Sequence, residues 1–244
     1  MPELAGRKVG IVACSGEELA EGTVTRLAAL KVLEELRPAE TVTICLPLFL
    51  AGGEGDRAFA RFYPTIAVDG CDKRCAARAT EQFSGKPAAS VVVTDLLAER
   101  GLDRPQGARR LDENGRLAVE VTADRVAGIV DELLGVRWDR RRGVVAEAEP
   151  QASPSAAPQA GCACGSGIPV QTVDVDGRAV PIAALPLIFE QFRSRGKAPG
   201  AEVATELLET VKIYNDVTPG TDEPLAAALE REYAAFCAQE PARS

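Results

Sequence analysis

The sequence predicts an α/β protein: a mostly parallel sheet with flanking helices, layered as in Rossmann-like or flavodoxin-like folds, followed by a small hairpin-and-helices domain. Three observations support this prediction. Residues 7–97 alternate short Val- and Ile-rich segments with helical segments, which is typical of parallel sheets covered on both faces. Residues 146–160 contain three prolines and no aromatic or branched aliphatic residue. After this break, a hairpin pattern and helical periodicities resume.

Four segments are expected to be the strands of the sheet, because each is short and apolar with little polar interruption. They are Val9–Ala13, Thr41–Leu46, Ile66–Val68 and Ser90–Thr94. Between them, apolar residues recur about once per helical turn from Val24 to Leu36, until Pro38 ends the run. A shorter helix is expected over Ala76–Phe83, ended by Gly85 and Pro87.

The segment after the fourth strand is expected to close the first domain. Asn114-Gly115 favours a hairpin within Asp112–Val121, and the apolar spacing of Ala123–Leu134 favours a helix. The sequence is thus divided into an α/β domain of residues 1–145, a flexible linker of residues 146–160 and a small α+β domain of residues 161–244. In the last, Asp176-Gly177 is expected to form a hairpin turn, and three helices follow.

Composition excludes several functions. The chain has no histidine, so Ser-His and Cys-His catalytic units and imidazole metal ligands are excluded. It carries 28 basic against 36 acidic residues, a net charge of −8, with most of the acidic excess after residue 145. Because binding to a phosphate backbone needs a concentrated basic surface, no nucleic acid partner is expected.

The chain is expected to be cytoplasmic, with no membrane association. Its first residues lack the basic start and apolar stretch of a signal peptide. The longest apolar run, Val42–Leu50, contains Pro47 and is far shorter than the ~20 residues that span a bilayer. Thiols stay reduced in the cytoplasm, so seven cysteines indicate metal or redox chemistry more than a disulfide framework.

Four cysteines are expected to converge at one edge of the sheet. Cys14 ends the first predicted strand, Cys45 lies near the end of the second, and Cys71 follows the third. Cys75 lies one helical turn after Cys71, at a helix start that favours a thiolate. Taken singly, each could be a small buried apolar residue. Together they suit Zn(II), another thiophilic metal or an Fe–S cluster.

The remaining cysteines are of two kinds. Cys162 and Cys164, separated by one residue between glycines, could form a second metal-binding or redox pair that exchanges its ligand, or could be incidental residues of the linker. Cys237 shares a helical face with Tyr233 and is expected to pack. Asp69 could accept a hydrogen bond behind a metal ligand or simply form a turn before Gly70.

Residues 7–97 resemble the DGC family, named for a central Asp-Gly-Cys motif and assigned to zinc binding from its cysteines. The matching residues are Asp69-Gly70-Cys71, the continuation to Cys75-Ala76, and Val91–Asp95. The resemblance implies that the four candidate chelating cysteines of the family correspond to Cys14, Cys45, Cys71 and Cys75. Residues 161–240 resemble a separate cysteine-led accessory module found in metal-handling contexts.

The leading hypothesis is a non-enzymatic protein that holds zinc or another thiophilic ion, in metal storage, sensing or transfer, with a metal-handling or redox protein as partner. The alternative is a thiol-redox or sulfur-transfer enzyme using the same cysteines. A third reading, an acidic scaffold whose C-terminal domain docks a partner, needs no cysteine chemistry. The sequence leaves open the element bound, because thiolates select a softness class, and the oligomeric state.

Overall fold

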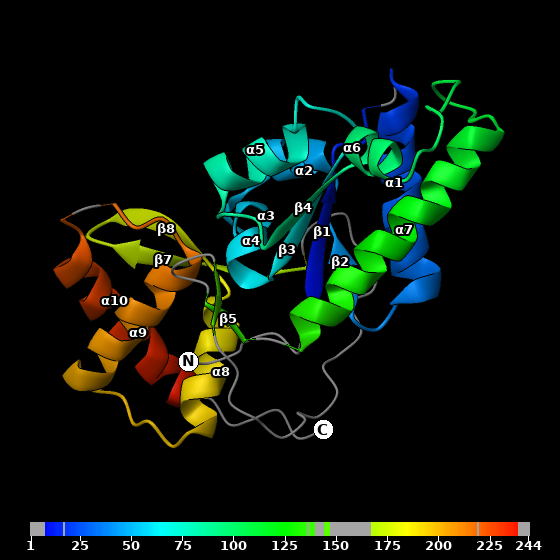
Figure 1. Cartoon of the computed structure of the whole chain (residues 1–244). Helices are drawn as coiled ribbons and strands as arrows, with labels where there is room; N and C mark the ends of the chain where they lie inside the picture. Colours follow the sequence, from blue (N-terminus) through cyan, green and yellow to red (C-terminus); the bar gives the residue numbers. More distant parts are fainter. Residues whose placement is uncertain are drawn as a thin grey trace. The chain divides into compact units, whose positions relative to one another are not determined.

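The computed structural model of the 244-residue chain describes residues 8–16, 18–135, 137–139, 144–146, 167–218 and 220–238. The chain divides into two compact units, one made of residues 5–166 and the other chiefly of residues 167–244 (Figure 1). The expected linker, residues 146–160, lies outside the described residues apart from Ala146, which ends a strand.

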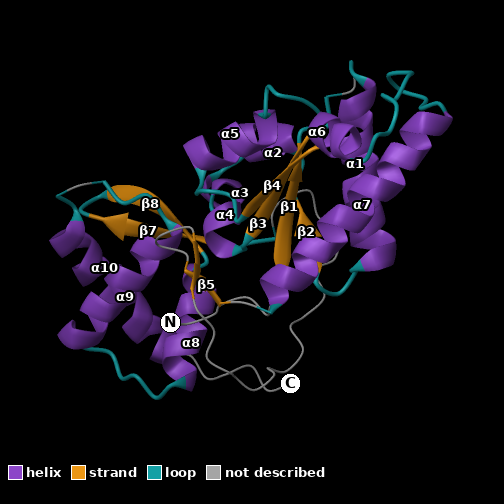
Figure 2. Cartoon of the chain, in the orientation of Figure 1, coloured by secondary structure: helices purple, strands orange, loops and turns teal. Residues whose placement is uncertain are grey.

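The first unit is built on a four-stranded, wholly parallel sheet with the order β2-β1-β3-β4 (Figure 2). The strands are β1 (Val9–Ala13), β2 (Thr41–Thr43), β3 (Thr65–Asp69) and β4 (Ala89–Val92). Ile11 pairs with Ile66 in the register of β1 and β3, and Val68 with Val91 in that of β3 and β4. The predicted α/β class is confirmed.

Helices cover both faces of this sheet (Figure 1). They are α1 (Ala20–Lys31), continued by a π-helical turn (Val32–Leu36), α2 (Leu46–Ala51), α3 (Glu54–Arg57), α4 (Phe59–Phe62), α5 (Cys75–Phe83), α6 (Val93–Glu99) and α7 (Glu113–Leu134). Alternate residues of β1 enter different cores: Ile11 packs with residues of α1 and α7, and Val12 with residues of α2 and α5. Each such buried side chain contributes roughly 1.5–3 kcal/mol.

Two predicted strands end earlier than expected. The second ends at Thr43 and the fourth at Val92, because helices α2 and α6 begin at Leu46 and Val93. Pro47 lies in the first turn of α2, where its missing N–H costs nothing. It therefore starts a helix directly after the second strand.

The hairpin predicted within Asp112–Val121 is wrong, because this segment is the first half of the 22-residue helix α7. The Asp112 carboxylate accepts the N–H of Gly115 at 2.7 Å and that of Gln106 at 3.1 Å. This N-cap satisfies a free donor of the first turn and keeps Asn114-Gly115 helical. An antiparallel pair follows α7, formed by β5 (Arg137–Asp139) and β6 (Val144–Ala146).

The second unit contains the predicted hairpin and three helices. Strands β7 (Val170–Val175) and β8 (Arg178–Ala183) pair antiparallel around Asp176 and Gly177, whose φ angles are 52° and 78°. Positive φ at both positions is the requirement of a type I′ turn. The helices are α8 (Leu185–Ser194), α9 (Ala201–Tyr214) and α10 (Asp222–Ala238).

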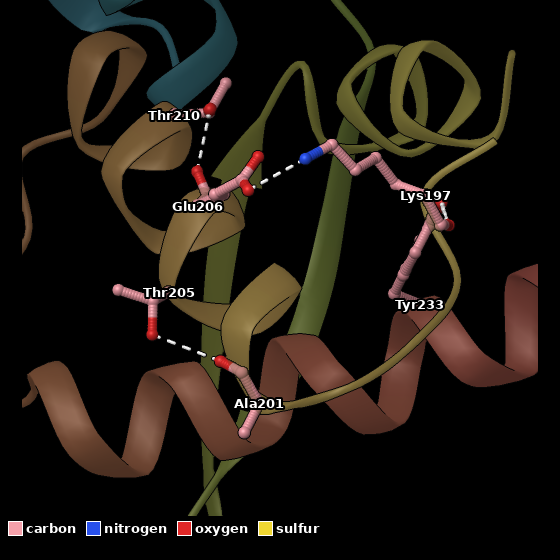
Figure 3. A network of polar contacts seen from close by, with 6 residues as sticks. All are labelled: Lys197, Ala201, Thr205, Glu206, Thr210 and Tyr233. Atoms are coloured by element: carbon pink, nitrogen blue, oxygen red, sulfur yellow. Dashed lines mark hydrogen bonds and ion pairs between the residues drawn. The ribbon is translucent and has the colours of Figure 1, made fainter. Parts of the chain in front are cut away.

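Polar contacts fix the loop between α8 and α9 against the neighbouring helices (Figure 3). The hydroxyl of the fully buried Tyr233 on α10 donates to the carbonyl of Lys197 at 2.7 Å. The Lys197 ammonium pairs with Glu206 on α9 at 2.9 Å. The loop is thereby tied to both following helices.

Candidate functional site

The four expected cysteines all follow strands at the carboxyl edge of the parallel sheet. Cys14 comes directly after β1, Cys45 two residues after β2 and Cys71 two residues after β3. Cys75 is the first residue of α5. Because β1 lies between β2 and β3, Cys14 occupies the middle of this edge.

The edge between β1 and β3 is the point at which the chain changes direction across the sheet. From β1 the chain crosses to β2 on one side, and from β2 it returns to β3 on the other side of β1. In open α/β sheets, ligands bind outside the carboxyl ends of the strands at such a point. Here Cys14 lies on one side of it and Gly70-Cys71 on the other.

Cys14 is partly buried and its sulfur has two polar neighbours. The backbone N–H of Gly70 donates to its Sγ at 3.4 Å, and the Thr25 Oγ1 lies 3.6 Å from the Sγ. Its own N–H donates to the carbonyl of Val68 at 2.9 Å, which holds the backbone against β3. The N–H of Gly70 is thus directed at the Cys14 sulfur from the loop that follows β3.

Thr25 was not expected at the site. Its side chain is fully buried on α1, where the hydroxyl donates to the carbonyl of Gly22 at 2.7 Å and accepts the N–H of Ser15 at 3.2 Å. Ser15 has a φ of 51°, a left-handed conformation that non-glycine residues rarely adopt. Thr25 therefore orders the turn immediately after Cys14. Only the folded chain brings residues 11 positions apart together, so no local pattern indicated this contact.

Two glycines allow the segments around Cys14 to approach closely. A Cβ at Gly22 would lie 2.0 Å from the carbonyl oxygen of Gly16. A Cβ at Gly70 would lie 2.9 Å from backbone atoms of Glu21 and Gly22. The glycine of the Asp-Gly-Cys sequence is thus required because its loop packs directly on the start of α1.

The aspartate of the same sequence has a different role. Asp69 is 1% exposed, and its carboxylate accepts the N–H of Ala76 at 2.7 Å and that of Ala77 at 3.0 Å. These are free donors of the first turn of α5. Of the two readings that the sequence left open, neither describes this contact: Asp69 caps the helix that carries Cys75. Burial raises the pKa of Asp69, and the two N–H groups oppose that rise.

Cys71 and Cys75 lie at the two ends of a short loop. The N–H of Arg74 donates to the carbonyl of Cys71 at 3.1 Å, and Arg74 has φ 51° and ψ 47°. Cys75 is exposed, yet its partial desolvation raises the pKa of its thiol, and negative charge on Cys14, Asp69 and Cys71 raises it further. The backbone hydrogen bond at the helix start lowers the pKa of Cys75, as expected, but desolvation and these charges outweigh it. The Cys75 thiol is therefore close enough to the other two thiols and to the Asp69 carboxylate to interact with their charges.

The structure does not assemble a finished metal centre. Among the residues described above, no three Cys, Asp or Glu side chains are grouped so that they could hold an ion as they stand. Cys45 is exposed at the N-cap of α2, while Cys14 and Cys71 are partly buried. The prediction of a single site made by all four thiols stays a prediction.

Of the three other cysteines, Cys162 and Cys164 lie outside the described residues. Cys237 is partly buried on α10. The burial of Tyr233 and its hydrogen bond to Cys237 raise the pKa of the Tyr233 hydroxyl. This contact is in keeping with the expected packing role.

Residues 10–120 match the family model of the DGC domain. The match confirms the predicted resemblance of this part of the chain to the DGC family, and it is called the DGC domain below. The matched range includes all four strands of the parallel sheet except Val9, the first residue of β1, and all four candidate thiols. No curated protein and no solved structure matches the chain. Within the part of the chain that the structure describes, no helix is long and apolar enough to cross a membrane.

Proposed function

We propose that this DGC domain holds a thiophilic metal ion, Zn(II) in the first instance, at the carboxyl edge of its sheet. One observation carries the proposal: Cys14 Sγ lies at the change of direction between β1 and β3, where it accepts the N–H of Gly70. Hydrogen bonds of this kind orient metal ligands and tune them. Cys14, Cys71, Cys75 and Cys45 are the proposed ligands.

The electrostatics of the site favour a cation. Cys75 feels the negative charges of Cys14, Cys71 and Asp69, so that deprotonating all the thiols together is unfavourable without a positive charge. A bound Zn(II) ion would neutralise this repulsion and crosslink the loops. Both Asp69 oxygens already accept backbone N–H groups, so this residue supports α5 and is not proposed as a ligand.

The physiological role that we propose is storage, sensing or transfer of the ion, with a metal-handling or redox protein as partner. The alternative, a thiol-redox or sulfur-transfer enzyme, needs a nucleophilic thiolate at neutral pH. The raised pKa of Cys75 argues against that residue as the nucleophile.

The test is the metal content of protein purified under reducing conditions without added metal. We expect about one ion per chain in the wild type. Cys14→Ser, Cys71→Ser and Cys75→Ser should each lose most of it, and Cys45→Ser tests the fourth ligand. Cys237→Ser, at a partly buried thiol of the second unit, is the matched control and should keep it. A metal-free wild type that also fails to bind added Zn(II) would contradict the proposal, and a reversible intramolecular disulfide would support the alternative.

A further inference from the structure

The outer edge of β4 is a second feature of the DGC domain, separate from the cysteines. β4 is the last strand of the sheet. The N–H groups of Ala88 and Thr94 donate inward, to Thr65 and Gly70, at 2.8 and 3.3 Å. Because backbone groups of a parallel strand alternate in direction, those of Ala89 and Val91 point away from β3. Among the described residues no strand pairs with them.

A cavity of about 300 Å³ follows this edge. Three consecutive residues of β4, beginning with Ser90, form part of its wall. Two basic and two acidic side chains form much of the rest, namely Arg74, Arg125, Asp95 and Glu99. Arg74 is held over the strand by its Nη2, which donates to the Ser90 Oγ at 3.1 Å.

We infer that this edge pairs with the β4 edge of a second copy of the chain, antiparallel and about a two-fold axis that passes between the two Val91 residues. Such pairing would join the N–H and C=O groups of the two Val91 residues and extend the sheet across both chains. A two-fold interface must be complementary to itself, since the same surface serves both partners.

The charges at the edge meet this requirement. In the antiparallel arrangement, Ser90 of one chain lies opposite Val92 of the other, next to the start of α6. Arg74, anchored on Ser90, is thereby directed toward the second copy's Asp95, which lies in the first turn of α6. The symmetry repeats this pair. A strongly acidic or strongly basic peptide would match only half of the charged groups, whereas a second copy matches both signs.

The inference is tested by sedimentation and light scattering of the full chain, with and without a chelator so that association through metal is recognised. The wild type should be a dimer in both. Arg74→Glu and Asp95→Arg should each be monomeric, because each homodimer would contain two like-charge pairs, and its dissociation constant should rise about a hundredfold or more. Arg78→Glu, the same charge reversal at an exposed position of α5 outside the cavity, should remain dimeric.

Mixing supplies the decisive measurement. When Arg74→Glu is mixed with Asp95→Arg, every pair in the heterodimer is again of opposite charge, so the dimer should return. Circular dichroism of each variant confirms folding before mixing. A monomeric wild type, or variants that dimerise as well as the wild type, would overturn the inference. So would a mixture that stays monomeric. None of these outcomes depends on whether the cysteines bind a metal.

Discussion

The Asp69 carboxylate accepts the N–H of Ala76 at 2.7 Å, which joins the end of β3 to the start of the helix that carries Cys75. The second oxygen accepts the N–H of Ala77. With Gly70 packed on the start of α1 and Cys71 beginning the loop, each residue of the Asp-Gly-Cys sequence has its own physical role. The motif fixes the loop that carries Cys71 and the start of the helix that carries Cys75.

Replacing Asp69 should therefore destabilise the domain even when no metal is present. Asp69→Ala removes a helix cap and leaves two N–H donors without acceptors at a buried position, at a cost of about 2 kcal/mol. Urea denaturation of the metal-free protein measures this. Asp124→Ala, at an exposed position of α7, is the control and should change the unfolding free energy little. Equal stability of the two variants would contradict the capping role.

Acid should weaken the contact between α7 and the end of the first helical segment. Arg37 donates to both oxygens of Asp131, at 2.7 and 2.6 Å, and holds the pKa of Asp131 below its ordinary value. An acid whose pKa is lowered by folding stabilises the protein above its unfolded pKa, and this contribution is lost as the pH falls through the folded value. Asp131→Asn should be less stable than the wild type at neutral pH.

The difference between Asp131→Asn and the wild type should shrink toward zero as the pH falls through the lowered pKa of Asp131, below which the carboxyl is protonated in both states. Urea midpoints across the acidic range provide the measurement. Glu132→Gln is the neighbouring control, because its partner Arg125 lies 3.7 Å away. A gap between Asp131→Asn and the wild type that stays constant down to the lowest pH would show that the ion pair is not its source.

Thr25 offers a test of the hydrogen bonds around Cys14. Thr25→Val keeps the shape but removes the acceptor for Ser15 and the hydroxyl next to the Cys14 sulfur, so the metal-free domain should lose about 1–2 kcal/mol of stability. If the proposed site is correct, Zn(II) affinity should also fall about tenfold or more. Thr25→Ser should restore both quantities.

The matched control for Thr25→Val is Thr122→Val. The Thr122 hydroxyl is buried and has no hydrogen-bond partner among the described residues, so its removal should be neutral or stabilising. Competition with a chromogenic chelator gives the affinities, and urea denaturation gives the stabilities. If Thr25→Val and Thr122→Val lost similar amounts of stability and Zn(II) affinity, the losses would not come from the hydrogen bonds around Cys14.

These residues show where sequence reasoning stops. The bounds of β1 follow from a local apolar pattern, which the sequence carries whatever the tertiary contacts. The shared edge at which the carboxyl ends of the strands meet follows from the alternation of strands and helices, which predicts a parallel sheet. Asn114-Gly115 does not form the predicted hairpin turn, because the carboxylate of Asp112, two residues before Asn114, caps a helix there instead. The Thr25 contact and the approach of Gly70 to Glu21 depend on how strands and helices pack, so no local periodicity predicts them.

Removing the metal should soften the DGC domain without unfolding it. Binding of a structural ion contributes to folding free energy, yet the sheet has buried cores on both faces that need no metal. Chelation should therefore lower the Tm while the far-ultraviolet circular dichroism stays native at room temperature. An unchanged Tm after verified metal removal would argue against a proposed ion that crosslinks the loops.

Cys162 and Cys164 follow the expected linker in the sequence and lie outside the described residues. Two thiols offer fewer ligands than four, so a soft ion should favour the site of the DGC domain at equilibrium, unless a partner protein removes it. The flexible linker that the sequence predicts for residues 146–160, which lie almost wholly outside the described residues, would have a root-mean-square span of about 20 Å and would let the pair reach that site. We therefore expect the pair to affect the rate of metal exchange more than the amount bound.

Replacing both Cys162 and Cys164 with Ser should leave the metal content of the DGC domain nearly intact while slowing its loading and its release. The measurement is the rate of metal transfer to a chromogenic chelator, compared among the wild type, the double variant and Cys237→Ser. Cys237→Ser controls for the loss of a thiol that packs beside Tyr233 and should transfer metal at the wild-type rate. Because the double variant removes only ligands outside the proposed centre, a fall in equilibrium metal content would place one of the two thiols within it, whereas equal rates in all three proteins would make both incidental.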